Sequence, residues 1–110
     1  MIYPKKFTAT IAVGDSTSNA LEILDFQRGI LEVPASEKTF GLSVANASTD
    51  TFRKVYNYHD ATNTAWAVAG IGTAFAVDIP DSVLSCKYVR VTADTTATAA
   101  AVTAYLHVAK

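Results

Sequence analysis

The sequence predicts an all-β fold, an antiparallel sandwich or barrel of eight or nine short strands. Three observations support this prediction. The chain contains 11 Val, 6 Ile and 14 Thr, together 31 of its 110 residues, and β-branched side chains favour a pleated surface over a helix. Apolar and polar residues alternate with period two in many short segments, as in half-buried strands. Turn-forming stretches separate these segments, and no helical segment of the length required for parallel βαβ units lies between them.

The first strand is expected at 7–13, where apolar side chains occupy the odd-numbered positions and Gly14-Asp15 ends the run. Similar alternation predicts the other strands at 21–26, 30–33, 39–45, 52–58, 73–79, 87–92 and 99–108, with 66–69 as a weaker candidate.

The best helical candidate is a single turn at 80–84. Proline is tolerated at the start of a helix, and Asp81 and Ser82 can satisfy free N–H groups there. The Ala- and Thr-rich stretch at 93–104 favours a helix by propensity alone. Its continuation argues for a last strand instead, because the even-numbered residues of 102–108 are all apolar.

Composition limits the class of protein. Nine Lys and Arg against ten Asp and Glu give a net charge of −1, so we expect neither nucleic acid nor a membrane surface as a partner. No apolar stretch approaches the roughly 20 residues that span a bilayer. The single Cys86 cannot form an internal disulfide, and the first residues do not resemble a secretory signal. We therefore expect folding in reducing cytoplasm, with residues 1–6 as an N-terminal arm and residues 7–110 as one β-sandwich domain.

No motif with a catalytic mechanism is present, and the chain is predicted not to be an enzyme. His59 and Asp60 are interpreted as a solvated loop tip and His107 as a surface residue of the last strand. Two histidines and one cysteine far apart do not supply a zinc site, and the glycines at 70 and 72 lack the rest of a phosphate-binding motif. Cys86 is interpreted as a small buried hydrophobe. No catalytic residue, metal or cofactor is therefore expected.

The candidate functional residues are those of an interface. Tyr56, Tyr58 and Trp66 lie around a polar loop, where core packing, a protein interface and stacking against sugar rings are the alternatives. In the N-terminal arm, Ile2 and Tyr3 are apolar side chains that a neighbouring subunit can cover. We predict that Ile2, Tyr3, Tyr58 and Trp66 form the contact surface.

Four segments resemble a known family. They are GILEVPA at 29–35, LSVAN at 42–46, STDTFRKVY at 48–56 and KYVRV at 87–91. This order is similar to that in small β-sandwich virion proteins of tailed phages, including the capsid decoration, or cement, proteins with a jelly-roll fold. The chain departs from the family pattern where Thr51 directly follows Asp50, without the hairpin glycine.

The resemblance implies a jelly-roll-like sandwich that binds the outside of a phage capsid and bridges neighbouring subunits, without catalysis. The implied partner is the major capsid protein, and a homodimer across a symmetry axis is a further expectation. The implied location is the capsid exterior of the virion, after synthesis in the host cytoplasm. An exposed edge strand could pair with a capsid strand or with a second copy. The alternative hypothesis is a carbohydrate- or receptor-binding sandwich module of a phage fibre or baseplate.

Overall fold

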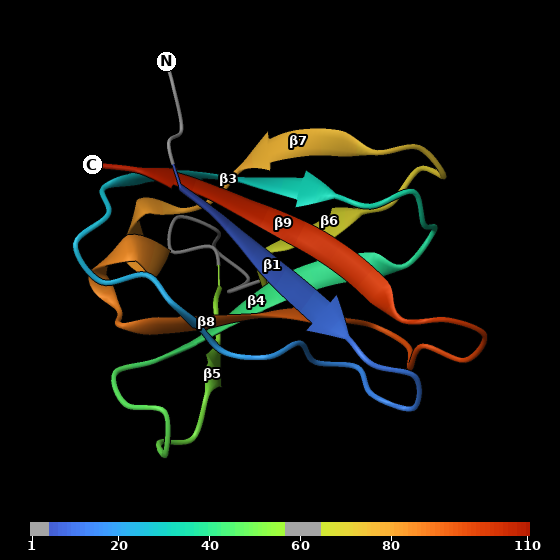
Figure 1. Cartoon of the computed structure of the whole chain (residues 1–110), viewed down its shortest axis with the longest axis horizontal. Coiled ribbons are helices and arrows are strands. Elements are labelled where there is room, and N and C mark those ends of the chain that lie inside the picture. The colour runs from blue at the N-terminus through green and yellow to red at the C-terminus, as the bar shows by residue number, and fades with distance from the viewer. Residues whose placement is uncertain (1–4, 57–64) are drawn as a thin grey trace.

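The protein forms two antiparallel β-sheets stacked face to face, as the computed structural model in Figure 1 shows. The structure describes residues 5–56 and 65–110. One sheet has the order β1-β9-β3-β7 and the other β2-β8-β4-β5, with β6 also paired to β4. The strands are β1 Lys5–Ile11, β2 Leu21–Glu22, β3 Arg28–Val33, β4 Thr39–Ala45, β5 Arg53–Lys54, β6 Ala67–Ala69, β7 Phe75–Asp78, β8 Tyr88–Ala93 and β9 Val102–Ala109, and a 3-10 turn, η1, covers Asp81–Ser85.

The strand order is that of a jelly roll. Both β5 and β6 pair with β4, at opposite ends of that strand, so they act as two halves of one interrupted strand. Counted in this way, eight strands pair first with last, second with seventh, third with sixth and fourth with fifth. Alternate pairs fall in opposite sheets, as in a long hairpin rolled up on itself. The predicted all-β, jelly-roll-like sandwich is confirmed.

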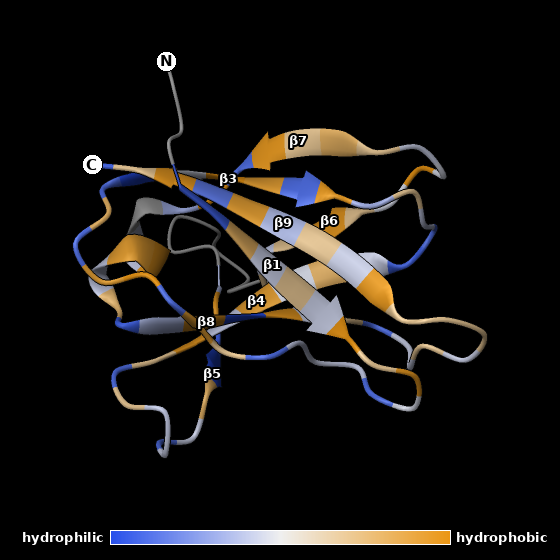
Figure 2. Ribbon diagram, in the orientation of Figure 1, coloured by the Kyte–Doolittle hydropathy of each residue, from blue (hydrophilic) through white to orange (hydrophobic). Residues whose placement is uncertain are grey.

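The core lies between the two sheets and follows the predicted alternation. On β9, Ala104, Leu106 and Val108 are buried and the residues between them are partly exposed. Figure 2 shows this pattern as alternating bands along the strand. The largest fully buried side chains come from both sheets and from the connections between them: Phe40, Ile11, Ile23, Leu31, Leu42, Leu106, Val33, Val83, Val89, Val91 and Val108.

Several predicted boundaries differ from the structure for local reasons. The segment predicted at 21–26 is a strand only over Leu21–Glu22, because the chain turns at Asp25, whose φ is +75°. Of the segment predicted at 52–58, the structure describes residues 52–56, and among these Arg53–Lys54 form a strand. At the amino end, β1 begins at Lys5, so residues 5 and 6 belong to the sheet and not to the predicted arm.

Two further predictions agree with the structure. The Ala- and Thr-rich segment leads into β9, which starts at Val102 and is a strand, not a helix. The predicted helical turn is η1, whose preceding residue is Pro80. None of the helical segments among residues 5–56 and 65–110 is long and apolar enough to cross a membrane.

Candidate functional site

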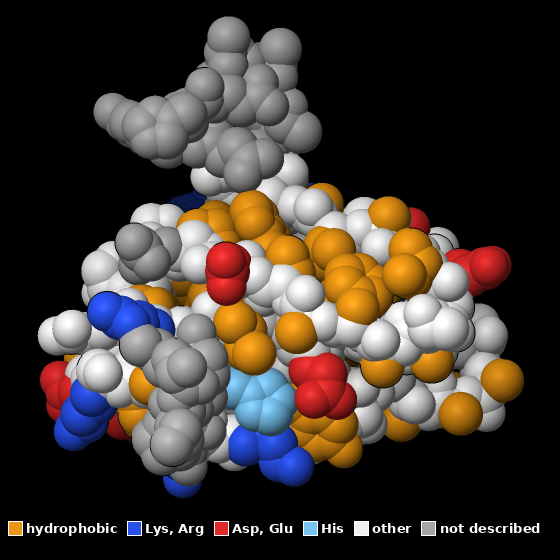
Figure 3. Space-filling model, turned by 90° about the horizontal axis from the view of Figure 1, so that it is seen from above, with side chains coloured by type: hydrophobic (Ala, Val, Ile, Leu, Met, Phe, Trp, Pro, Cys, Tyr) orange, Lys and Arg blue, Asp and Glu red, His pale blue; other side chains and the backbone are white. Residues whose placement is uncertain are grey.

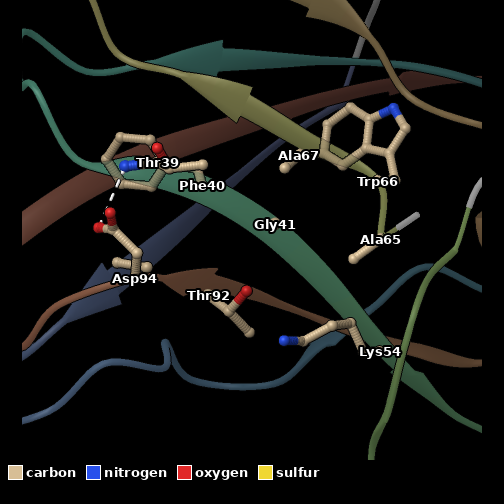
Figure 4. Close-up of a pocket in the computed structure, with 10 residues that line it drawn as sticks. Thr39, Phe40, Gly41, Lys54, Ala65, Trp66, Ala67, Thr92 and Asp94 are labelled. Atoms are coloured by element: carbon tan, nitrogen blue, oxygen red, sulfur yellow. Dashed lines mark hydrogen bonds between the residues drawn. The ribbon is translucent and has the colours of Figure 1, made fainter.

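A pocket of about 120 Å³ opens beside the outer face of the five-stranded sheet (Figure 4). It lies where the first residues of β4 are flanked by β6 and β8. Lys54 of β5 reaches it from the side. The lining residues are Thr39, Phe40, Gly41, Lys54, Ala65, Trp66, Ala67, Thr92, Ala93 and Asp94.

Small residues on three adjacent strands leave this space open. Gly41 is in register with Thr92 of β8 on one side and with Ala67 of β6 on the other. A Cβ atom at Gly41 would lie 3.0 Å from Thr92 Oγ1 and 3.3 Å from the backbone oxygen of Trp66. The bare backbone of Gly41 therefore forms part of the pocket floor, and any larger residue would begin to fill it.

The two charged residues of the pocket lie at its opposite ends (Figure 4). The Asp94 carboxylate accepts a hydrogen bond from the backbone N–H of Thr39, at 3.1 Å. Lys54 is exposed, and its ammonium group points across β4 towards Thr92. The acidic end is thus tied to the backbone of β4, while the basic end faces solvent.

A second cation lies across β4 from Lys54, on the same face of the sheet. Ser43 is in register with both Lys54 and Arg90, so the two basic residues flank it. The Arg90 guanidinium carbon is 4.2 Å from the centre of the Phe52 ring, a cation–π contact that holds the side chain over the sheet. Within the part of the chain that the structure describes, Arg90 Nε is buried without a hydrogen-bond partner.

The outer face of the four-stranded sheet carries a different polar group. His107 Nε2 lies 3.1 Å from Glu32 Oε1, with both side chains partly exposed. Nearby, the Lys6 ammonium is 4.7 Å from the centre of the Tyr105 ring. These contacts link β1, β9 and β3 across the surface. Both contacts are cross-strand pairs of the kind that stabilises a sheet.

The two edges of the four-stranded sheet differ in how their backbone groups are covered. On β1, Asn19 Oδ1 accepts a hydrogen bond from Thr10 N at 2.8 Å, and Asn19 Nδ2 donates one to Thr8 O at 3.3 Å. The Asn19 side chain therefore takes the place that a neighbouring strand would occupy. Covering an edge in this way protects it from pairing with another chain.

On β7 the corresponding groups are open. Ile79 N donates to Gly29 O at 3.3 Å, next to the paired residues of β3 and β7. Because hydrogen-bonded and non-bonded pairs alternate along antiparallel strands, the N–H and C=O groups of Ala76 and Asp78 point away from β3. No hydrogen bond from another described segment reaches them. This edge is available for strand pairing.

Apolar side chains surround the open edge. Figure 3 looks down on the side of the molecule where β7 lies and shows hydrophobic side chains gathered across it. Val68 of β6 and Phe75 and Val77 of β7 are partly exposed there. Ile71, in the connection between the two strands, is 66% exposed. An exposed apolar patch beside an open strand edge has the character of a protein interface.

The predicted site residues are only partly placed by the structure. Ile2, Tyr3 and Tyr58 lie outside the described residues, as do His59 and Asp60.

Trp66 is partly buried and packs against the core, and its indole points away from Lys54 and Thr92 (Figure 4). Its predicted role in an interface stays a prediction. Tyr56 is 54% exposed. Cys86 is a free, partly exposed cysteine, so it is less buried than predicted.

Gly41, Lys54 and Arg90 were not predicted as site residues. They are far apart in the sequence and meet only through the register of β4 with its two neighbours. No local spacing signals such a group. Among residues 5–56 and 65–110, no three His, Cys, Asp or Glu side chains are grouped closely enough to hold a metal ion. Comparison of the chain with family models, curated proteins and solved structures gives no match.

Proposed function

We propose that the chain is a structural virion protein, a decoration protein that binds the outer surface of a phage capsid and bridges neighbouring capsid subunits. The proposal rests on the open β7 edge with its apolar surroundings. It is supported by the four segments that resemble phage virion proteins and by the jelly-roll strand order that this resemblance implies. The proposed partner is the major capsid protein, and the proposed location is the exterior of the virion.

The open edge supplies a physical mechanism for this role. An extended capsid segment adds to β7 by hydrogen bonding to Ala76 and Asp78, and apolar contacts with Phe75, Val77 and Ile71 add affinity. Each contact contributes little binding energy, but many copies bind to one shell and their contributions add up. A subunit that touches two capsid proteins gains avidity, because the second contact forms at high effective concentration. No catalytic step is part of this role.

The same edge would also serve a homodimer. In an antiparallel pair of β7 strands, Ala76 of one copy can lie opposite Asp78 of the other, which keeps the two aspartates from facing each other directly. A dimer formed in this way hides the edge from the capsid. Dimerisation in solution and capsid binding would then compete for β7.

The proposal is tested by co-sedimentation of the purified chain with empty capsid shells, followed by imaging of the shells. We expect saturable binding. Ala76→Pro removes the N–H that faces the open edge, and proline is tolerated at such positions of edge strands. Ala76→Lys places a long charged side chain on the same edge strand. Both variants should bind shells more weakly than the wild type.

Circular dichroism and urea unfolding establish that each variant is folded. Thr8→Lys on the covered β1 edge is the matched control, and it should bind as the wild type does. Wild-type chain that stays in the supernatant refutes capsid binding. Folded Ala76 variants that saturate shells with unchanged affinity refute the role of β7.

A further inference from the structure

The pocket beside β6 combines apolar walls with a basic mouth. Ala65 and Ala67 line it with small apolar side chains, and Gly41 leaves the floor open. Lys54 enters from one side (Figure 4). A ligand that fits needs a short apolar stem and a group that accepts hydrogen bonds from an ammonium ion.

Among the described residues, no acidic side chain forms an ion pair with the cations near the mouth. Lys87 pairs with Glu22 and His107 with Glu32, whereas neither Lys54 nor Arg90 forms an ion pair with a described residue. Asp94 lies at the far end of the pocket and is bound to the backbone of β4. Lys54 at the pocket and Arg90 on the other side of Ser43 both favour an anionic group on this face of the sheet.

The volume limits the size of that group. A closed cavity of about 150 Å³ holds one benzene molecule, so a pocket of about 120 Å³ has room for one side chain.

In aspartate a single methylene group joins the carboxylate to the backbone, so the carboxylate would stay close to the backbone of the partner protein. Glutamate has a second methylene group to place against the alanine walls.

We infer that this pocket receives a glutamate side chain of a partner protein. The glutamate carboxylate accepts hydrogen bonds from the Lys54 ammonium group and the Thr92 hydroxyl, and its methylene groups pack against Ala67. Arg90 adds positive charge from the neighbouring strand. The inference goes beyond the proposed function, because it concerns a different surface from the β7 edge and holds for any protein that supplies the glutamate.

The test uses the purified full chain and two short peptides, acetyl-Gly-Glu-Gly-amide and its glutamine counterpart, followed by amide NMR. The two peptides differ only in the charged group. The glutamate peptide should bind with millimolar affinity and shift the amides of Gly41, Ala67 and Thr92. Added salt should weaken this binding, because the mouth of the pocket is exposed. The glutamine peptide should shift these amides much less.

Lys54→Gln should weaken glutamate binding up to about fivefold, which corresponds to an exposed ion pair of up to about 1 kcal/mol. Lys54 is exposed on a two-residue strand, so the variant should fold. Lys87→Gln is the matched control, because Lys87 directly precedes β8 of the same sheet but pairs with Glu22 at 4.0 Å. It should bind the peptide as the wild type does.

Three results would overturn the inference. They are the absence of any saturable shift at tens of millimolar glutamate peptide, equal shifts with the glutamine peptide, and unchanged affinity in folded Lys54→Gln. Because no capsid takes part, failure here leaves the proposal for the β7 edge standing. Failure of the shell experiment likewise leaves the pocket proposal standing.

Discussion

The side chain of Asn19 is predicted to stabilise the fold by closing the β1 edge, and Asn19→Ala tests this. The bond from Thr10 N, at 2.8 Å, has ordinary length, and the bond to Thr8 O is longer, at 3.3 Å. Each hydrogen bond contributes about 0.5–1.5 kcal/mol net. Both are exposed, so water replaces them in the variant. The free energy of unfolding should therefore fall by about 1–2 kcal/mol.

The assay is urea unfolding followed by the fluorescence of Trp66, which packs against the core. Asn46→Ala is the matched control, because Asn46 is exposed just after β4 and forms no hydrogen bond with another described residue. The changes in the free energy of unfolding of the two variants are then compared. A difference of less than about 0.3 kcal/mol, which is the usual scatter between independent sites, would refute the capping role of Asn19.

Asn19→Asp gives a second measurement at the same position. It keeps an acceptor for Thr10 N but places an oxygen beside Thr8 O, so it should destabilise the fold at least as much as Asn19→Ala. A smaller effect would contradict the hydrogen-bond assignment.

Three further substitutions test the packing. Gly70→Ala should lower the free energy of unfolding by about 2–4 kcal/mol, because its Cβ would overlap the backbone oxygen of Ser36; a near-neutral result in thermal unfolding would contradict that close approach. Gly14→Ala should cost only about 1–2 kcal/mol, since φ is +91° but nothing lies within 4 Å of the added carbon; it serves as the comparison in the same assay. Leu106→Ala should lower the free energy of unfolding by about 2–5 kcal/mol, because Leu106 is 1% exposed on an inner strand. If urea unfolding gives a value within about 1 kcal/mol of the wild type, Leu106 is not part of a packed core.

Local pattern was sufficient to predict the strands that have one face in the core. Residues 39–45 alternate strictly enough that the predicted and observed bounds of β4 coincide. Burial on alternate positions of β9 likewise outweighed the helix propensity of its alanines. In both strands, the side chains that face the core specify the conformation directly.

The remaining structure depends on contacts between distant segments. Ile23 is fully buried although it lies beyond β2, because its N–H bonds to the backbone oxygen of Lys87, at 2.8 Å. The division of one strand into β5 and β6 also has no signal in their residues. The same holds for the candidate pocket: Gly41 and Lys54 are ordinary residues until pairing brings them together.

The place of β9 has a consequence for synthesis on the ribosome. This strand lies between β1 and β3 and pairs with both, yet it is translated after every other strand. Until it emerges, β1 has no strand to pair with, and β3 can pair only with β7. Nascent chains are therefore vulnerable to misassembly late in translation, and a premature stop codon before Val102 would remove the strand on which that whole sheet is assembled.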